Sequence, residues 1–207
     1  MTRIFIRNDH AWLPAGVSEI LRRRLIDVAG IALTTFAAML LVALISFTPG
    51  DPSFNHATDV PPRNLLGVFG AAASDLMLHV LGLAIALPVT AMGVWGWRVV
   101  NRLPLTVPGV RVAAVCVASV LLAAALAALP IPGNWPLAVP LGGLLGMLTL
   151  DGLAAAFDAM GGPMSPALVA VVCGVLGLAA GAASFGLSAA EWARLGRAVA
   201  RFGRFLG

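Results

Sequence analysis

The stretch "LIDVAGIALTTFAAMLLVALISF", residues 25–47, decides the fold class, because it is an apolar run long enough to cross a bilayer. An α-helix needs about 20 such residues to span a hydrocarbon core of about 30 Å. The run follows three arginines and ends without a small-residue cleavage site, so we interpret it as a retained span rather than a secretory signal. With 60% hydrophobic and 11% charged residues, the chain cannot cover a globule with polar surface. The sequence therefore predicts an all-α membrane protein.

Three more apolar runs reach the length of a span, at 76–97, 112–131 and 164–187. A fifth candidate, 137–150, is too short, at about 14 residues, to fit a span comfortably, and Asp151 and Asp158 follow it. Its composition suits a re-entrant or interfacial helix better. Length alone leaves an extra span, a surface helix or a long loop open for residues 137–160.

The basic residues favour four spans, with both termini on the cytoplasmic side. All 13 basic residues are arginine, and only Arg63 would then lie outside. This distribution is the positive-inside pattern. A basic patch for DNA on the inner side is an alternative use of the same charges. The inner arginines are Arg3, Arg7, Arg22, Arg23, Arg24, Arg98, Arg102, Arg111, Arg194, Arg197, Arg201 and Arg204.

The connection between the first two spans, "SFTPGDPSFNHATDVPPRNLLGVFG" at 46–70, contains four prolines, three glycines and two aspartates. Pro49 and Gly50 fit the central pair of a type II turn, and the later prolines keep the chain extended. The composition predicts an ordered outer loop that ends the first helix near Phe47. An ordinary polar loop between two spans is the simpler interpretation of the same composition.

The order of residues in this connection is more specific than its composition. A Ser-aromatic-x-Pro-x-Asp-Pro-Ser segment and an Asn-Leu-x-Gly-x-x-Gly-Ala segment resemble the N-terminal four-span membrane region of FtsK/SpoIIIE-type DNA translocases. The resemblance continues through 130–146 and 186–199, although the acidic residue after the second Gly-x-x-Gly is displaced to Asp151. The matching residues are Ser46, Phe47, Pro49, Asp51, Pro52, Ser53, Asn64, Leu65, Gly67, Gly70, Ala71, Asp75 and Leu76.

The resemblance implies a membrane anchor and division scaffold for a translocase that moves chromosomal DNA through the closing septum. It implies a multi-pass protein of the bacterial inner membrane, with divisome membrane proteins as partners and a hexamer formed through the motor. DNA would be contacted only by that motor. The sequence contains no lysine, whereas a Walker A loop needs one, so we expect no enzyme activity here and a longer parent protein. Candidate partner contacts are Ser46, Pro49, Asp51, Pro52, Asn64, Gly67, Gly70 and Asp75.

An internal duplication is a further hypothesis. "NLLGVFGAAASDLMLHVLG" and "PLGGLLGMLTLDGLAAAFDAMGG" share a glycine-spaced start, an aspartate and a glycine at the end. Each half would then run span, outer loop, glycine-rich shelf and span, and 141–160 would be a helix at the outer surface. Chance similarity between glycine-rich stretches is the alternative. Within the spans, Pro88 predicts a kink, and Gly177 and Gly181 predict close helix approach.

Candidate chemistry is sparse. Asp75 and His79, at i and i+4 near the predicted outer start of the second span, suit capping and hydrogen bonding better than a metal site or proton relay. Cys116 and Cys173 lie in apolar runs and are interpreted as small buried hydrophobes. We expect no cofactor. A small transporter or channel subunit is the alternative function, for which charged residues inside the spans would be typical.

The sequence divides into a cytoplasmic segment 1–24, a transmembrane domain 25–187 and a basic amphipathic helix 188–207 that leads to a linker. On a helical wheel, one face of the last segment is apolar and the opposite face basic. We expect this helix to lie on anionic lipid of the inner leaflet, and packing on the motor's linker is the alternative. The apolar face is Trp192, Leu195, Val199, Phe202 and Leu206; the lipid contacts are Arg194, Arg197, Arg201 and Arg204.

Overall fold

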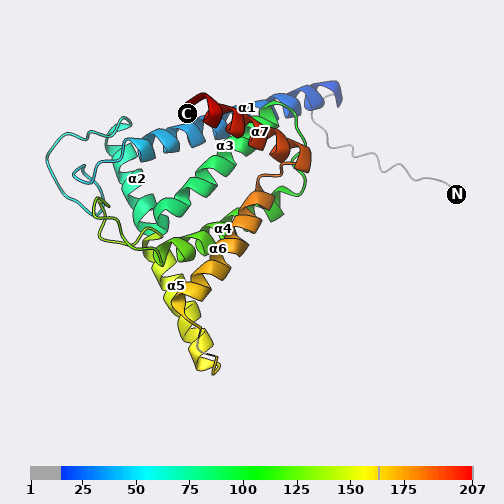
Figure 1. Ribbon diagram of the computed structural model, residues 1–207. Helices are drawn as coiled ribbons and strands as arrows, with labels where there is room; N and C mark the ends of the chain where they lie inside the picture. The colour runs from blue at the N-terminus through cyan, green and yellow to red at the C-terminus, as the bar shows by residue number, and fades with distance from the viewer. Residues whose placement is uncertain (1–14, 163, 207) are drawn as a thin grey trace.

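The computed structural model describes residues 15–162 and 164–206, and these residues form helices and loops without a β-strand (Figure 1). Seven α-helices and one short 3₁₀-helix follow one another along the described chain. They are α1 Ala15–Ile45, α2 Gly67–Leu81, η1 Gly82–Ile85, α3 Ala86–Val100, α4 Pro108–Ala127, α5 Gly143–Ala159, α6 Pro166–Ser184 and α7 Ala189–Leu206.

The predicted number of membrane spans is confirmed. Within the described residues, four helical segments are long and apolar enough to cross a membrane: Val17–Ile45, Gly67–Val100, Pro108–Ala127 and Pro166–Ser184. Helix α5 is not among them. Large apolar side chains such as Val171 and Leu178 are more than 60% exposed, as expected for surfaces that face lipid.

Helix α1 begins at Ala15, before the predicted start of the first span at residue 25. Residues 15–24 of the predicted cytoplasmic segment form the first turns of α1, and the rest of that segment, 1–14, lies outside the described residues. Glu19 supports these turns because its carboxylate accepts bonds from Arg22 at 3.1 Å and Arg23 at 2.8 Å, the i,i+3 and i,i+4 neighbours on a helix surface.

The predicted second span, 76–97, is two helices that meet at an angle (Figure 1). Helix α2 ends at Leu81, Gly82 adopts φ +56°, and the chain passes through η1 into α3. The amide of Leu83 leaves the helix and donates to the carbonyl of Leu141 at 2.8 Å. Pro88 contributes to the break, because it has no N–H and its ring disfavours a helical carbonyl at Ala84, four residues earlier.

The helices pack as two antiparallel pairs, α1 with α3 and α4 with α6 (Figure 1). The most buried positions are small: Ala91, Ala118, Ala123 and Ala124 are fully inaccessible. As predicted, Gly177 allows a close approach, since a Cβ there would lie 2.9 Å from Cγ of Leu122 in α4. Small residues that let helices approach closely are typical of membrane bundles.

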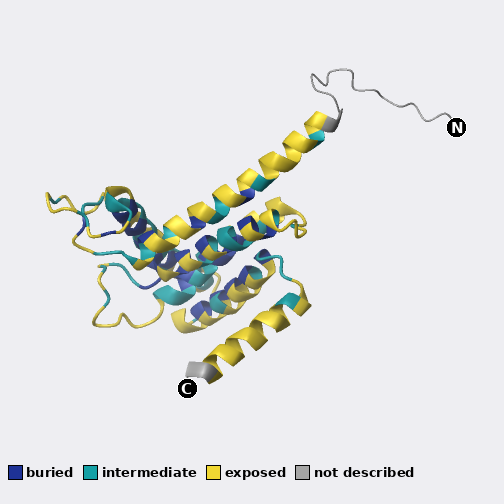
Figure 2. Cartoon of the chain, turned by 90° about the horizontal axis from the view of Figure 1, so that it is seen from above, coloured by how far each residue is buried: buried dark blue, intermediate teal, exposed yellow. Residues whose placement is uncertain are grey.

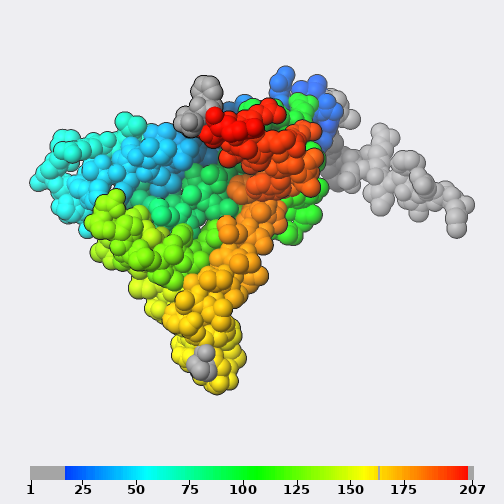
Figure 3. All heavy atoms as spheres, in the orientation of Figure 1, coloured from blue at the N-terminus to red at the C-terminus, as the bar shows by residue number. Residues whose placement is uncertain are grey.

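One end of the bundle carries the long connections 46–66 and 128–142, and we name it the loop end. The opposite end carries the connection 101–107 and α7, and we name it the α7 end. Helices α2 and α5 lie at the loop end, and α5 projects from the bundle beyond α4 (Figures 1 and 3). Helix α4 ends at Ala127, whereas the predicted span ends at residue 131. Helix α6 ends at Ser184, whereas the predicted span ends at residue 187. The prolines at 130 and 132 fit the early end of α4.

The two halves of the described chain have the same element order, which is the layout predicted from the duplication. Each half runs from a span (α1 or α4) through a loop and a shelf helix (α2 or α5) to a second span (α3 or α6). Both shelf helices begin on a glycine with positive φ, +65° at Gly67 and +67° at Gly143. Three residues later Gly70 and Gly146 are both buried.

Candidate functional site at the loop end and on α7

Asp51 organises the connection between α1 and α2. Its carboxylate is 5% exposed and accepts two backbone hydrogen bonds, from the amide of Arg63 at 2.9 Å and from the amide of Asn64 at 2.8 Å. A single side chain therefore closes the loop by fixing residues from its beginning and its end. Pro52 follows directly, and a residue before proline is held in an extended conformation.

Asn64 links the two helices that flank this loop. Its side-chain amide donates to the carbonyls of Ala43 at 2.8 Å and Ser46 at 3.3 Å, and its Oδ1 accepts from the amide of Leu66 at 3.0 Å. Ser46 adds a bond of 3.2 Å from the amide of Leu65 to its hydroxyl. These bonds satisfy carbonyls at the end of α1 and amides before α2, groups that a helix leaves unpaired. We name Ser46, Asp51 and Asn64 the loop anchor.

The glycines of the motif make room for the loop anchor. A Cβ at Gly70 would collide with Oδ1 of Asn64 and would come within 2.6 Å of Cβ of Leu66. Gly67 starts α2 with φ +65°, a conformation that favours glycine. Pro49 lies in a turn closed by a 3.1 Å bond from the amide of Asp51 to the carbonyl of Thr48. The predicted type II geometry is wrong, because Gly50 does not have the positive φ that type II requires.

Asp75 ties the loop to α2. Its Oδ2 accepts from the side-chain amide of Asn55 at 2.8 Å, and its Oδ1 lies 3.1 Å from Nδ1 of His79. The predicted place of Asp75 at the start of a helix is wrong, since α2 begins at Gly67, about two turns earlier. Asp75 is buried, whereas Asp151, its counterpart in α5, is exposed. Among the described residues, no group of three or more His, Cys, Asp or Glu could hold a metal ion.

Apolar side chains surround these polar contacts at the loop end. Phe54, Leu65 and Phe69 are 79%, 76% and 89% exposed. The shelf helix α5 and the residue after it expose Leu144, Leu148 and Met160. We name Phe54, Leu65 and Phe69 the apolar rim. These three exposed side chains lie within a few residues of Asp51 or Asn64 in the sequence, so the loop anchor fixes the backbone next to them.

Helix α7 separates its charged and apolar residues. Arg194, Arg197, Arg201 and Arg204 are all exposed. On the apolar face, Trp192, Leu195, Val199 and Phe202 are between 37% and 65% exposed, and the side chain of Leu206 lies outside the described residues. Figure 2 shows α7 lying along the bundle and exposed over most of its surface. A helix with this division of residues is suited to a membrane interface.

Two contacts fix the start of α7 to the bundle. Arg98 at the end of α3 donates to Glu191 at 2.9 Å, and Phe185 meets Trp192 edge to face with ring centroids 6.1 Å apart. The amide of Ser188 donates to Glu191 at 2.7 Å, and the amide of Glu191 donates to the Ser188 hydroxyl at 3.3 Å. Sequence reasoning missed Arg98 and Glu191 as contacts, although the spacing Ser-x-x-Glu is a capping-box signature.

The comparisons with known proteins agree with this architecture. The family described as the 4TM region of DNA translocase FtsK/SpoIIIE matches residues 22–199, which include most of the first span, the other three spans and the loop anchor. The chain belongs to this family. The FtsK four-helix region thus accounts for most of the chain, and the resemblance drawn from the loop motif is confirmed.

Three relatives illustrate the match. The DNA translocase FtsK of Bradyrhizobium diazoefficiens is 35% identical over 86% of this chain, and that of Azospirillum brasilense is also 35% identical over 86%. The DNA translocase FtsK of Caulobacter vibrioides is 37% identical over 71% of this chain. The chain spans only 22%, 29% and 18% of the length of these relatives, so it matches their membrane region alone. No solved structure gives a significant match.

Proposed function

We propose that this four-helix region anchors a DNA-translocating motor in the bacterial inner membrane and recruits division proteins at the septum through its loop end. The observation that carries the proposal is the loop anchor, in which buried Asp51 and Asn64 hold a loop whose apolar rim stays exposed. A loop that only closed a turn would not need buried polar contacts to shape it.

The arginine distribution supports an orientation with the loop end on the outer side of the membrane. Arg98, Arg102 and Arg111 lie at the α7 end, together with the four exposed arginines of α7, whereas Arg63 lies in the loop. Positive charge is retained on the cytoplasmic side during insertion. In this orientation α7 meets anionic lipid of the inner leaflet and leads toward the motor. DNA contact and assembly into a hexamer belong to that motor.

Partner recognition is proposed for the apolar rim and for the exposed side chains of α5. Apolar patches at the edge of a membrane are natural docking sites for other membrane proteins. The partner is a membrane protein of the division machinery that offers an apolar surface at the outer interface.

The alternative, a small transporter or channel subunit, needs polar groups that are available to a substrate. The hydroxyls of Ser74, Ser119 and Ser184 are buried between the helices, but each donates to a carbonyl of its own helix at 2.8, 2.7 and 2.6 Å. Their polarity is therefore used locally. This arrangement supports the anchor over the transporter.

The experiment replaces 48–64 with a Gly/Ser linker of equal length in the full-length translocase. A second variant, Phe54→Ser with Leu65→Ser and Phe69→Ser, removes the apolar rim but keeps the loop anchor. At matched membrane abundance, both variants should insert normally and lose septal localisation and division rescue. The same linker exchange at 128–139 is the control. Normal localisation and rescue by the triple variant would refute the proposed partner surface.

A further inference from the structure

Arg98 is a buried cation, and one of its three nitrogens has no hydrogen-bond partner among the described residues. Its side chain lies at the α7 end of α3 and the residue is 4% exposed. One terminal nitrogen donates to Glu191 at 2.9 Å and the other to the carbonyl of Pro104 at 3.0 Å. The third nitrogen, Nε, is buried without a partner among the described residues. An unpaired buried donor of a charged group is costly, so it points to a ligand.

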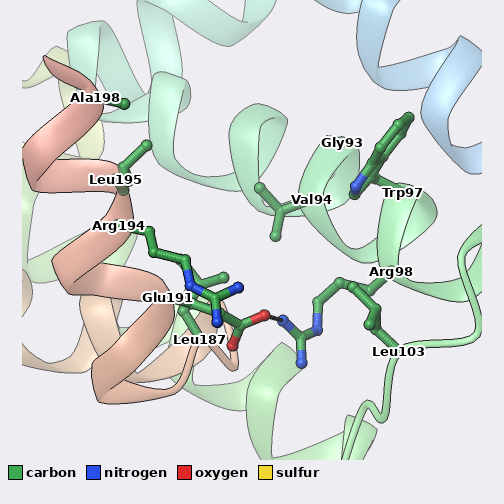
Figure 4. Close-up of a pocket in the computed structure, with 10 residues that line it drawn as sticks. All are labelled: Gly93, Val94, Trp97, Arg98, Leu103, Leu187, Glu191, Arg194, Leu195 and Ala198. Atoms are coloured by element: carbon green, nitrogen blue, oxygen red, sulfur yellow. Dashed lines mark hydrogen bonds and ion pairs between the residues drawn. The ribbon is translucent and has the colours of Figure 1, made fainter. Parts of the chain in front are cut away.

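A cavity of 530 Å³ lies beside this side chain, between α3 and α7 (Figure 4). We name it the α3–α7 groove. Its lining is mostly apolar, and Arg194 is the second cation on its wall. Figure 4 shows the Arg194 side chain pointing into the groove beside Glu191. The residues that matter for its chemistry are Val94, Trp97, Arg98, Arg194, Leu195 and Ala198.

The charges of the groove match a phosphodiester. Both oxygens of Glu191 are occupied, Oε1 by Arg98 and Oε2 by the amide of Ser188. Arg98 and Arg194 together with Glu191 leave one net positive charge at the groove. A phosphodiester carries one negative charge and acceptor oxygens for a guanidinium N–H.

We propose that the α3–α7 groove binds one anionic phospholipid. Its phosphate faces the guanidinium groups of Arg98 and Arg194, and its acyl chain lies along Val94, Leu195 and Ala198. Trp97, which is 61% exposed, lies at the rim, where indole rings favour the membrane interface. The bound lipid fills the space that the two helices leave between them and couples the direction of α7 to the span α3.

This proposal goes beyond general attraction of α7 to an anionic surface. Attraction through Arg197, Arg201 and Arg204 involves many lipids and is screened by salt. The groove instead binds one lipid, with a headgroup preference set by the guanidinium groups of Arg98 and Arg194. It rests on the membrane location of the chain, and it does not depend on the partner surface proposed for the loop end.

The test is native mass spectrometry of the purified chain in detergent, with phosphatidylglycerol or phosphatidylcholine added. The wild-type chain should retain one phosphatidylglycerol and no phosphatidylcholine. Arg98→Lys keeps the charge but removes the guanidinium, and it should weaken phosphatidylglycerol binding by at least about tenfold, the effect of one charge-assisted hydrogen bond. Ala198→Trp should abolish binding by filling the groove from an exposed position on α7.

Matched controls separate the groove from other effects. Ala200→Trp on α7 and Arg102→Lys beside α3 do not line the groove, and both should bind like the wild type. Replacing Arg197, Arg201 and Arg204 with Gln should lower attachment to anionic vesicles yet keep the single bound lipid. Equal binding of phosphatidylcholine, full binding by a folded Ala198→Trp variant, or saturation of the site by inorganic phosphate alone would each overturn the proposal.

Discussion

Glu191 in the first turn of α7 accepts a 2.9 Å hydrogen bond from Arg98 at the end of α3, although the two residues lie far apart in the sequence. The same carboxylate accepts the amide of Ser188 and so also caps α7. One acidic side chain therefore starts the amphipathic helix and attaches it to a span. The attachment of α7 should respond to the ionisation of Glu191.

The first prediction concerns pH. The hydrogen bond from the amide of Ser188, with further support from Arg98, lowers the pKa of Glu191 below its ordinary value. Because the pKa is lower in the docked state, ionised Glu191 stabilises docking above the ordinary pKa, and this contribution is lost as the pH falls through the lowered value. Spin labels at Val110 and Ala200 should show a broadened distance distribution in acid.

Two variants check the assignment, in a background with Cys116→Ala and Cys173→Ala. Glu191→Gln should give the broadened distribution at neutral pH and remove the pH dependence. Glu19→Gln, in the first turns of α1, should leave the distribution and its pH response unchanged. A distribution for Glu191→Gln that stayed as narrow as the wild type would show that another contact holds α7.

The second prediction concerns the loop anchor. Asp51→Asn replaces one acceptor oxygen with an NH₂ group, which leaves either the part-buried amide of Arg63 or the buried amide of Asn64 unpaired, and should lower the free energy of unfolding by about 1–3 kcal/mol. Asp59→Asn, exposed in the same loop, should change it by less than about 0.5 kcal/mol. Thermal unfolding in detergent and proteolysis of the loop measure both. Equal stability of the two variants would contradict the role of Asp51.

The third prediction uses two glycines of one helix. A Cβ at Gly146 would collide with the carbonyl oxygen of Ala123 in α4, and both groups belong to rigid helices. Gly146→Ala should therefore separate α5 from α4 and destabilise the protein by about 1–3 kcal/mol. Gly152 has open space around it, so Gly152→Ala should stabilise α5 by up to about 1 kcal/mol. Melting temperatures that shift in the same direction would refute the contact.

The sequence predicted the features that depend on local composition. Hydrophobic length gave the four spans, the arginine spacing of α7 gave its two faces, and the loop motif pointed to Ser46, Asp51 and Asn64. These features can be predicted from the sequence because a long apolar segment is enough to indicate a span and an amphipathic segment is enough to indicate an interfacial helix.

The features that the sequence did not predict depend on distant contacts. Pro88 predicts a kink in the second span, but the sequence does not predict that the helix breaks at Gly82. That break depends on the carbonyl of Leu141, from the other half of the chain. The burial of Arg98 was likewise hidden, because its partner Glu191 lies beyond two further spans. Asp75 was placed at a helix start because the apolar run, rather than Gly67, was used to set the boundary.

The last prediction concerns orientation. Val60, 57% exposed in the loop, and Asn101, exposed after α3, lie at opposite ends of the bundle. In a background without native cysteines, Val60→Cys should react with a membrane-impermeant thiol reagent in intact cells, whereas Asn101→Cys should react only after permeabilisation. The reason is that the arginines gather at the α7 end, and moving that end across the membrane is disfavoured. Labelling of Asn101→Cys in intact cells would place the arginines outside. The loop anchor would then face the cytoplasm, and an outer partner surface would be excluded.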